Sequence, residues 1–303
     1  MIRLLLAFQL AVPPGLDTYI PAPAANPLTR ENAALGKRLF FDKRLSRDGT
    51  VSCGTCHDPA HAFTDTQPRA VGIAGRTGPR RTPTVINRAF GQSQFWDGRA
   101  ATLEDQVLKP IANPDEMDSS PEDAARRTGV PVPQMAAALA TYVRTILAGG
   151  SPYDRYLAGD RTALDAGALA GLKLFRGKAS CASCHVGPNL TDERFHVTGA
   201  GRDPAADEGR AAVTRQPADR AAFKTPTLRE VARRAPYMHD GSLRTLEDVI
   251  ELYDRGGPEK GAPANLDAEM QPLKLTPEEK RQLAAFLRAL TGVVKDGYDD
   301  ASR

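Results

Sequence analysis

Apolar side chains recur at intervals of three and four residues in three stretches of the chain, residues 31–41, 133–147 and 277–290. This spacing puts them on one face of a helix, so an amphipathic helix is predicted in each stretch. The middle helix is expected to end near Gly149, and Pro152 follows shortly after, as is typical of a helix terminus. Strand patterns are few. We therefore expect a mainly α-helical protein.

The chain is longer than one ordinary compact domain. Its 303 residues predict two domains that share an interface. Residues 28–150 and 165–292 are the expected domains, and residues 1–27 precede them as a signal-like and Pro-rich segment. Residues 199–222 are rich in Gly, Asp and Arg with little periodicity, and are expected to form a long surface loop.

The four cysteines fall in two complete C-x-x-C-H motifs. These are Cys53-Gly-Thr-Cys56-His57 and Cys181-Ala-Ser-Cys184-His185. Cysteines at this spacing present both sulfurs to one edge of a porphyrin, and the next histidine can turn its imidazole onto the iron. The sequence therefore predicts two covalently attached c-type haems with His57 and His185 as iron ligands.

Other interpretations of these motifs are a zinc site, a redox-active C-x-x-C pair and two disulfides. Zinc ribbons keep their cysteine pairs about 15 to 20 residues apart, whereas these motifs lie in opposite halves of the chain. No βαβ pattern surrounds either pair, as a thioredoxin-like site requires. Covalent haem is the favoured interpretation. Because such haems are attached outside the cytoplasmic membrane, a periplasmic location is expected.

Composition and charge exclude some classes of partner. The net charge is +3, with 25% charged and 41% hydrophobic residues, which is typical of a globular protein. No long basic run is present, so neither nucleic acid nor an anionic membrane surface is an expected partner. The apolar run from Leu4 to Val12 resembles a short secretory signal and is too short to cross a bilayer, so no stable membrane insertion is expected.

A duplication links the two halves. At one constant offset, Thr82-Pro-Thr84 recurs as Thr225-Pro-Thr227, Asp97-Gly98 as Asp240-Gly241, and Thr102-Leu-Glu-Asp105 as Thr245-Leu-Glu-Asp248. Duplicated units are expected to place equivalent positions at equivalent places around the two haems. Thr102 and Thr245 are each expected to cap the helix that follows.

Despite the duplication, the two haem surroundings are expected to differ chemically. At the same offset Trp96 matches His239, Gln106 matches Val249, and Pro110 matches Tyr253. The first half therefore has an amide where the second has an aliphatic side chain, and a proline where the second has a phenol.

Four strings resemble the bacterial dihaem cytochrome c peroxidase and MauG family. They are Ser52-Cys-Gly-Thr-Cys-His-Asp58, Phe95-Trp-Asp-Gly-Arg99, Asn113-Pro-Asp-Glu-Met117 and Ala235-Pro-Tyr-Met-His-Asp-Gly241. With the two haem motifs, the resemblance spans roughly residues 28–292. It implies two cytochrome c-like haem domains packed against each other, with long loops. It also implies an oxidoreductase whose N-terminal haem reacts with hydrogen peroxide and whose C-terminal haem handles electrons.

The resemblance further implies which residues act on peroxide. In the family, a glutamine and a glutamate ten residues apart line the distal face of the N-terminal haem, and Gln106 and Glu116 stand at that spacing. A carboxylate can move a proton between the peroxide oxygens while a hydrogen-bond donor holds them. Otherwise Glu116 is a solvent-facing loop carboxylate. Residues 70–75, where classical members carry a blocking histidine, have none, and His61 is interpreted as structural, so an open iron position is expected.

For the second haem, the resemblance places the distal ligand seventeen residues after Pro236, at Tyr253. Methionine stands there in classical peroxidases, whereas tyrosine is the MauG-type arrangement, and a phenolate stabilises oxidised iron. The alternative is that Tyr253 is a packed aromatic and that Met270 or Met238 binds the iron.

Trp96 is the single tryptophan, and the resemblance implies that it relays electrons between the haems. A relay must be buried between the porphyrins, so a buried aromatic is compatible with this role. The family also implies a calcium ion between the domains, but Arg81 stands where its asparagine ligand is expected. A guanidinium cannot ligate calcium and can replace its charge. Backbone carbonyls near Arg234 and Pro236 would remain available.

Three functions remain open at this stage. The first is a peroxidase that reduces hydrogen peroxide to water with electrons from a small periplasmic donor, a cytochrome c or a cupredoxin. The second is a MauG-like enzyme that uses peroxide to oxidise Trp or Tyr of a partner protein, and Tyr253 favours it. The third is a non-enzymatic electron carrier, which predicts no reaction with peroxide.

Overall fold

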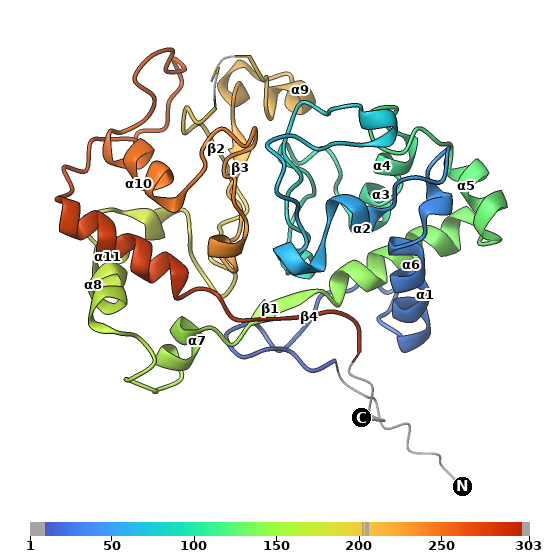
Figure 1. Ribbon diagram of the computed structural model, residues 1–303, viewed down its shortest axis with the longest axis horizontal. Coiled ribbons are helices and arrows are strands. Elements are labelled where there is room, and N and C mark those ends of the chain that lie inside the picture. Colours follow the sequence, from blue (N-terminus) through green and yellow to red (C-terminus); the bar gives the residue numbers. More distant parts are fainter. Residues whose placement is uncertain (1–9, 202, 204–205, 299–303) are drawn as a thin grey trace, which may run out of the picture.

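The structure is a computed structural model that describes residues 10–201, 203 and 206–298. Residues 1–9 carry most of the expected signal-like run and lie outside the described residues. Helices dominate the described chain, and its strands are few and short (Figure 1). The expected mainly α-helical class is confirmed.

The α-helices of the described chain are divided between its two halves. The first half contains α1 (Arg30–Phe40), α2 (Cys53–Cys56), α3 (Leu103–Gln106), α4 (Lys109–Ala112), α5 (Pro121–Thr128) and α6 (Val132–Arg144). The second half contains α7 (Pro152–Leu157), α8 (Ala166–Arg176), α9 (Ala211–Thr214), α10 (Leu246–Asp254) and α11 (Pro277–Arg288). The helices expected over residues 31–41 and 277–290 are therefore α1 and α11.

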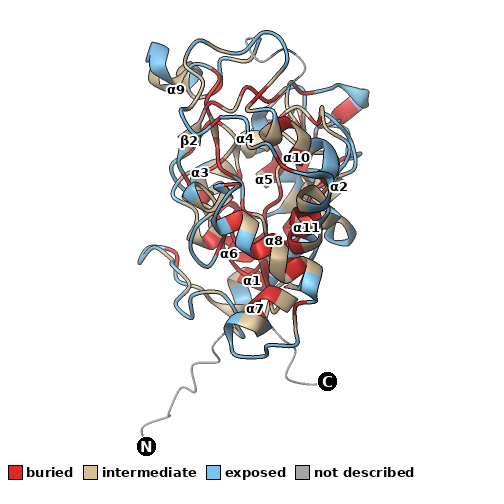
Figure 2. Ribbon diagram, turned by 90° about the vertical axis from the view of Figure 1, so that its left-hand side faces the viewer, coloured by how far each residue is buried: buried red, intermediate tan, exposed pale blue. Residues whose placement is uncertain are grey.

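Each half has its own hydrophobic core. The buried residues of the first core lie between Leu39 and Ala148, and those of the second between Tyr153 and Leu290. In the first half α1 packs against α6, and in the second α8 packs against α11 (Figure 1). Buried positions follow these helices, while α9 and the surrounding loops are largely exposed (Figure 2). The domain boundaries expected between residues 150 and 165 stay a prediction.

A glycine lets the two helices of each pair approach closely. A Cβ atom on Gly36 of α1 would lie 1.9 Å from the carbonyl oxygen of Ala138. One on Gly171 of α8 would lie 1.9 Å from the carbonyl oxygen of Gln282. No side chain fits at such distances, so both helix crossings require glycine. The duplication thus extends to backbone packing.

The expected helix caps are confirmed. The Thr102 hydroxyl accepts a hydrogen bond from the Asp105 backbone N–H at 3.1 Å, and that of Thr245 accepts one from Asp248 at 3.0 Å. The helices then differ. Pro110 has no N–H for an i→i−4 bond, and the first copy is broken into α3 and α4. With Tyr253 at the equivalent position, α10 continues without a break.

One predicted boundary is wrong. The helix expected over residues 133–147 ends at Arg144, and β1 (Leu147–Gly149) pairs antiparallel with β4 (Val293–Lys295). An apolar run has the same appearance in a buried helix and in a buried strand, and here a distant partner strand decides. The C-terminal chain thereby returns to the first half, where the Tyr142 hydroxyl donates to Asp296 at 2.7 Å.

The segment expected as a long loop is mostly irregular in its described part. Its described part contains the short helix α9 and a 3-10 turn (Pro217–Asp219), and it leads into β3 (Phe223–Lys224), which pairs with β2 (Phe195–His196). Among the described residues, none of the helices combines the length and the apolar character needed to span a bilayer.

Candidate functional site

Both C-x-x-C-H motifs contribute residues to the wall of one cavity. Its volume is about 570 Å³, and its lining includes His57 from the first half and His185 from the second. Helix α2 carries the first cysteine pair, and the short 3-10 turn η5 (Cys181–Ser183) begins the second. Motifs separated by more than a hundred residues therefore open into the same space.

The two histidines are held in the same way. The Nδ1 atom of His57 lies 3.1 Å from the carbonyl oxygen of Phe63, and Nδ1 of His185 lies 3.0 Å from that of Leu190. Burial lowers the pKa of His57 and lowers that of His185 to about 4, so both rings are neutral at physiological pH. A neutral ring that donates from Nδ1 has a free lone pair on Nε2. This is the usual arrangement of a metal-bound histidine.

The cysteines are free thiols rather than disulfides. Burial raises the pKa of Cys53, Cys56 and Cys181 to about 12. A redox-active C-x-x-C pair requires the opposite shift, because its thiolate must form near neutral pH. The thiols therefore argue against disulfide exchange and fit attachment to a group in the cavity.

One group of side chains could in principle bind a metal ion directly. Cys184, Asp192 and His196 bring ligand atoms within 4.8 Å of one another. However, both ring nitrogens of His196 already have partners, Asp192 at 2.9 Å and Asp267 at 2.5 Å. The donor set thus lacks a free imidazole nitrogen for a metal ion.

Two unpaired donors on the cavity wall also fit a porphyrin. The Nε atoms of Arg81 and Arg234 are buried and have no hydrogen-bond partner. A buried donor left unsatisfied is costly, and the carboxylates of a haem would satisfy such guanidinium groups. Together with the free Nε2 positions, this makes the cavity suitable for haem.

The residues expected to act on peroxide lie on the wall of the first half. Gln106, Pro110 and Glu116 all line the cavity with His57. Burial raises the pKa of Glu116, although Asn113 and then Arg99 act to lower it. The Asn113 side-chain amide donates to Glu116 Oε1 at 2.7 Å. Glu116 is therefore a cavity carboxylate, not the solvent-facing one of the alternative interpretation.

The second half carries different side chains at two equivalent positions of the cavity wall. Val249 and Tyr253 line the cavity at the positions equivalent to Gln106 and Pro110. Burial raises the pKa of the Tyr253 phenol, so it is protonated unless a cation such as iron binds its oxygen. Met270, the alternative ligand, lines the same cavity. Both candidate ligands for the second iron, Tyr253 and Met270, therefore line the cavity.

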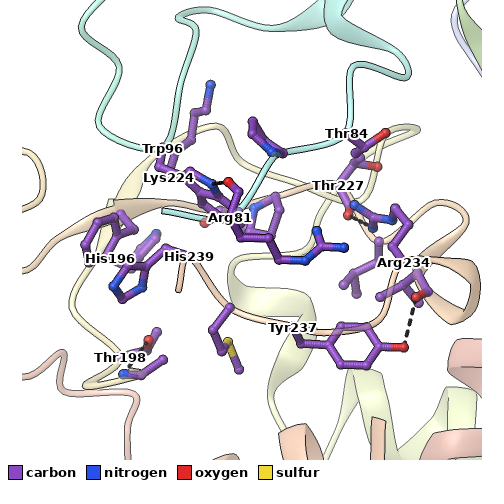
Figure 3. A pocket seen from close by; sticks show the side chains of 18 of the residues that line it. Arg81, Thr84, Trp96, His196, Thr198, Lys224, Thr227, Arg234, Tyr237 and His239 are labelled. Atoms are coloured by element: carbon purple, nitrogen blue, oxygen red, sulfur yellow. Dashed lines mark hydrogen bonds between the residues drawn. The ribbon is translucent and has the colours of Figure 1, made fainter. Parts of the chain in front are cut away.

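Trp96 lies where the two halves meet. Its indole N–H donates to the carbonyl oxygen of Arg81 at 2.9 Å, and its own carbonyl accepts from the Lys224 backbone N–H at 2.8 Å. Figure 3 shows Trp96, Arg81, Lys224 and His239 among the residues that line the cavity. His239, the counterpart of Trp96, stacks on the Phe223 ring at a centroid distance of 3.7 Å.

Arg81 connects the halves through backbone oxygens. Its guanidinium donates to the carbonyl of Asp65 at 2.7 Å and to that of Ala235, in the second half, at 3.3 Å. Carbonyl oxygens of this kind are also the ligands that calcium prefers. Because a guanidinium already occupies them, the residues do not fit a calcium ion here.

His61, which was interpreted as structural, is not part of the cavity wall, and its Nδ1 lies 2.9 Å from Asp58 at the surface. Lys224, Asn113 and His196 reach the cavity but were not identified from the sequence. For Lys224 a signal existed, because it stands at the repeat position of Arg81, directly before the second Thr-Pro-Thr.

Two family models match the chain. Residues 30–130 match the model described as di-haem cytochrome c peroxidase, and residues 168–291 match the cytochrome c model. Each match contains one C-x-x-C-H motif.

Curated relatives bear two kinds of name. The chain is 44% identical to the methylamine utilization protein MauG of Methylorubrum extorquens, over 89% of this chain and 81% of that protein. It is 37% identical to the cytochrome c551 peroxidase of Pseudomonas aeruginosa, over 88% of this chain and 80% of that protein.

Solved structures share the fold. A MauG-like protein associated with microbial copper homeostasis matches with a TM-score of 0.83 at 35% identity, over 92% of this chain and 94% of that chain. The diheme peroxidase BthA from Burkholderia thailandensis matches with a TM-score of 0.78 at 27% identity, over 88% of this chain and 87% of that chain.

Proposed function

The chain belongs to the di-haem cytochrome c peroxidase and MauG family of haem enzymes, and we propose that it reduces hydrogen peroxide to water at its N-terminal haem. Cys53 and Cys56 attach that haem, and Cys181 and Cys184 attach the other. His57 and His185 are the proximal ligands. The proposed location is the periplasm, with a small cytochrome c or cupredoxin as the electron donor.

The unequal walls of the cavity carry this proposal. The first half presents the amide of Gln106 and the carboxylate of Glu116, whereas the second presents Val249 and Tyr253 at the equivalent places of Gln106 and Pro110. A site that only passes electrons has no need of an acid-base group at the position of Glu116. The acid-base step is therefore assigned to Glu116 of the first half.

The residues supply protons and position to the reaction. When bound, the haem irons supply the redox equivalents and the site where peroxide is reduced. Glu116 takes a proton from one peroxide oxygen and returns it to the other, and Gln106 donates a hydrogen bond that holds the substrate. Each peroxide takes up two electrons and two protons and leaves as two waters. Trp96, between the halves, passes the electrons from the His185 side.

A second candidate is a MauG-like activity that oxidises Trp or Tyr of a partner protein. Tyr253 supports it, because a phenolate ligand on the second iron favours oxidised states. Met270 in that role would support the peroxidase instead. The third candidate, an electron carrier, leaves the half-buried Glu116 of the cavity wall without a function.

Stoichiometric peroxide added to the fully oxidised protein tests the proposal. Both enzymatic candidates require a prompt change in the haem absorption spectrum, and an unchanged spectrum would leave only the carrier. Turnover with reduced small cytochrome c then separates a peroxidase from an enzyme that modifies a partner protein. In parallel, Tyr253→Phe and Met270→Leu identify the second iron's ligand, since only the true ligand's loss alters the low-spin spectrum.

A further inference from the structure

Lys224 and Arg81 are equivalent residues of the duplication, and both cross the boundary between the halves. The Arg81 backbone N–H donates to the carbonyl of His239 at 2.7 Å, and that of Lys224 donates to the carbonyl of Trp96 at 2.8 Å. Each half therefore uses a cationic residue to hold the other half's residue at the Trp96 or His239 position. The Arg81 guanidinium donates hydrogen bonds to backbone carbonyl oxygens. The Lys224 side chain has different partners.

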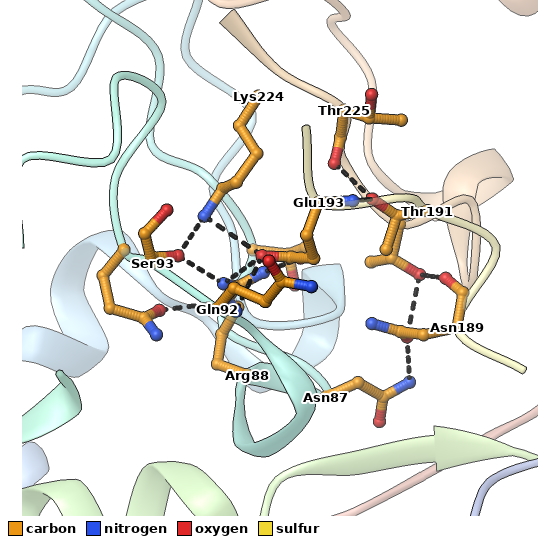
Figure 4. A network of polar contacts seen from close by, with 12 residues as sticks. Asn87, Arg88, Gln92, Ser93, Asn189, Thr191, Glu193, Lys224 and Thr225 are labelled. Carbon is orange, nitrogen blue, oxygen red and sulfur yellow. Dashed lines mark hydrogen bonds and ion pairs between the residues drawn. The ribbon is translucent and has the colours of Figure 1, made fainter. Parts of the chain in front are cut away.

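The Lys224 side chain ends in a buried cluster of charges. It is 7% exposed, its ammonium group donates to the Ser93 carbonyl, and it lies 3.6 Å from Glu193 Oε2. Glu193 is buried too and accepts from both Nη atoms of Arg88, at 2.7 and 3.0 Å (Figure 4). Two cations thus share one carboxylate. The cluster carries one surplus positive charge while Lys224 is protonated.

Most of the other charged side chains beside this segment are paired with an opposite charge, whereas the Arg210 guanidinium donates to the carbonyls of Asp97 and Gly98. Asp97, which follows Trp96, pairs with Arg80 at 2.6 Å and with Arg99 at 3.0 Å, and Arg80 also pairs with Asp207 at 2.7 Å. Lys224 differs from these residues, because the carboxylate nearest to it, that of Glu193, forms a closer ion pair with Arg88.

An oxidised Trp96 would be sensitive to such a charge. Its indole N–H donates to the backbone carbonyl of Arg81, which is too weak a base to accept the proton. When the indole gives up an electron it therefore keeps its proton and becomes a cation. A positive charge close by opposes that step.

We propose that Lys224 is a positioning residue for electron transfer through Trp96. The buried ammonium group of Lys224 opposes positive charge on the Trp96 indole and so slows the relay. The inference rests on the proposed relay role of Trp96. The step itself is balanced: the indole loses one electron toward the His57 side and regains one from the His185 side. No bond forms or breaks, and no proton leaves.

The surroundings let this charge change near neutral pH. Burial, and then Arg88, lower the pKa of Lys224 to about 7, although Glu193 opposes the shift. Burial acts to raise the pKa of Glu193, but Arg88 and then Lys224 lower it overall, so the carboxylate stays ionised. Burial also lowers the pKa of the nearby His239, which is thus neutral in the same range. Deprotonation of Lys224 removes the surplus charge as pH rises.

Two variants of the holoprotein separate charge from packing. Lys224→Met keeps most of the length of the side chain and the backbone N–H that binds Trp96, but has no charge. Lys224→Arg keeps the charge at every pH of interest. The rate to measure is the re-oxidation of the reduced C-terminal haem after mixing with peroxide, followed by stopped-flow absorption across the neutral range. Lys173→Met, at an exposed position of α8, is the matched control.

The wild-type and control rates should rise several-fold as pH increases through about 7. The Met variant should be fast and the Arg variant slow, each independent of pH in this range. Profiles shared by all four proteins, or a Met variant slower than wild type at every pH, would overturn the proposal.

A second readout does not depend on activity. With carbon-13 at lysine Cε, NMR should reveal one resonance that titrates near neutral pH and is missing in Lys224→Arg. A Lys224 resonance that titrates only in the usual alkaline range would also refute the proposal. By contrast, a protein whose first haem never responds to peroxide would refute the proposed function, and the NMR titration would still be interpretable.

Discussion

Replacing Glu116 by glutamine tests the proposed chemistry most directly. Glutamine has the same shape, and its oxygen can still accept the hydrogen bond that Asn113 donates at 2.7 Å. Packing and loop structure should therefore persist. The change removes only the ability to take up and return a proton.

The size of the effect distinguishes two roles. Loss of a general acid-base group slows a reaction by about 10²- to 10⁴-fold, or about 2.7 to 5.4 kcal/mol of activation free energy. A carboxylate that contributed only one hydrogen bond would account for about 0.5 to 1.5 kcal/mol, roughly a two- to tenfold loss. We expect the larger effect in Glu116→Gln.

The assay is the second-order rate of peroxide reaction with the oxidised protein, measured by stopped-flow absorption at several pH values. Because burial raises the pKa of Glu116, the base form is present above that raised pKa and is lost as pH falls through it. The wild-type rate should therefore fall as pH falls, and the rate of Glu116→Gln should not depend on pH in this way. The control is Glu122→Gln, at an exposed position of α5. A Glu116→Gln rate within tenfold of wild type would refute the acid-base role.

Three further changes probe how the site is supported. Gly72→Ala should slow the peroxide reaction, because its Cβ would lie 2.2 Å from the Asp115 carbonyl oxygen and 2.6 Å from the Glu116 Cα. The control Gly78→Ala should not slow it, because its Cβ would lie 3.8 Å from the nearest atom. Equal rates for the two variants would contradict this reasoning. Gly171→Ala should lower the free energy of unfolding by about 1–3 kcal/mol through overpacking, measured by chemical denaturation. Gly167→Ala, in the same helix and 3.3 Å from its nearest atom, should not. Treatment with a calcium chelator should leave the melting temperature and the haem spectrum unchanged, because Arg81 already binds the carbonyl oxygens; a chelator-dependent loss restored by calcium would contradict this.

Much of the site could be predicted because its signals are local or repeated. The C-x-x-C-H spacing indicated haem before any tertiary contact was known. The constant offset between the halves predicted that Gln106 would be equivalent to Val249 and Pro110 to Tyr253, and all four line the cavity. The roles assigned to these residues stay predictions.

Contacts between distant segments could not be predicted. The chain from Leu147 to Gly149 is a strand only because β4 returns from the far end of the chain to pair with it. The salt bridge between Arg88 and Glu193, and the contact of Lys224 with Ser93, depend on how the halves dock. No sequence motif or repeat indicates any of these three contacts.

The haem motifs, the capped helices and the inequality of the two halves can be recognised from the amino-acid order alone, since each depends on residues a few positions apart or on a repeat of such a group. The electrostatics around Trp96 and the place of Glu116 on the cavity wall arise only from folding. Burial and charge compensation depend on which surfaces exclude water together, and that is a property of the folded chain's path rather than of any short segment.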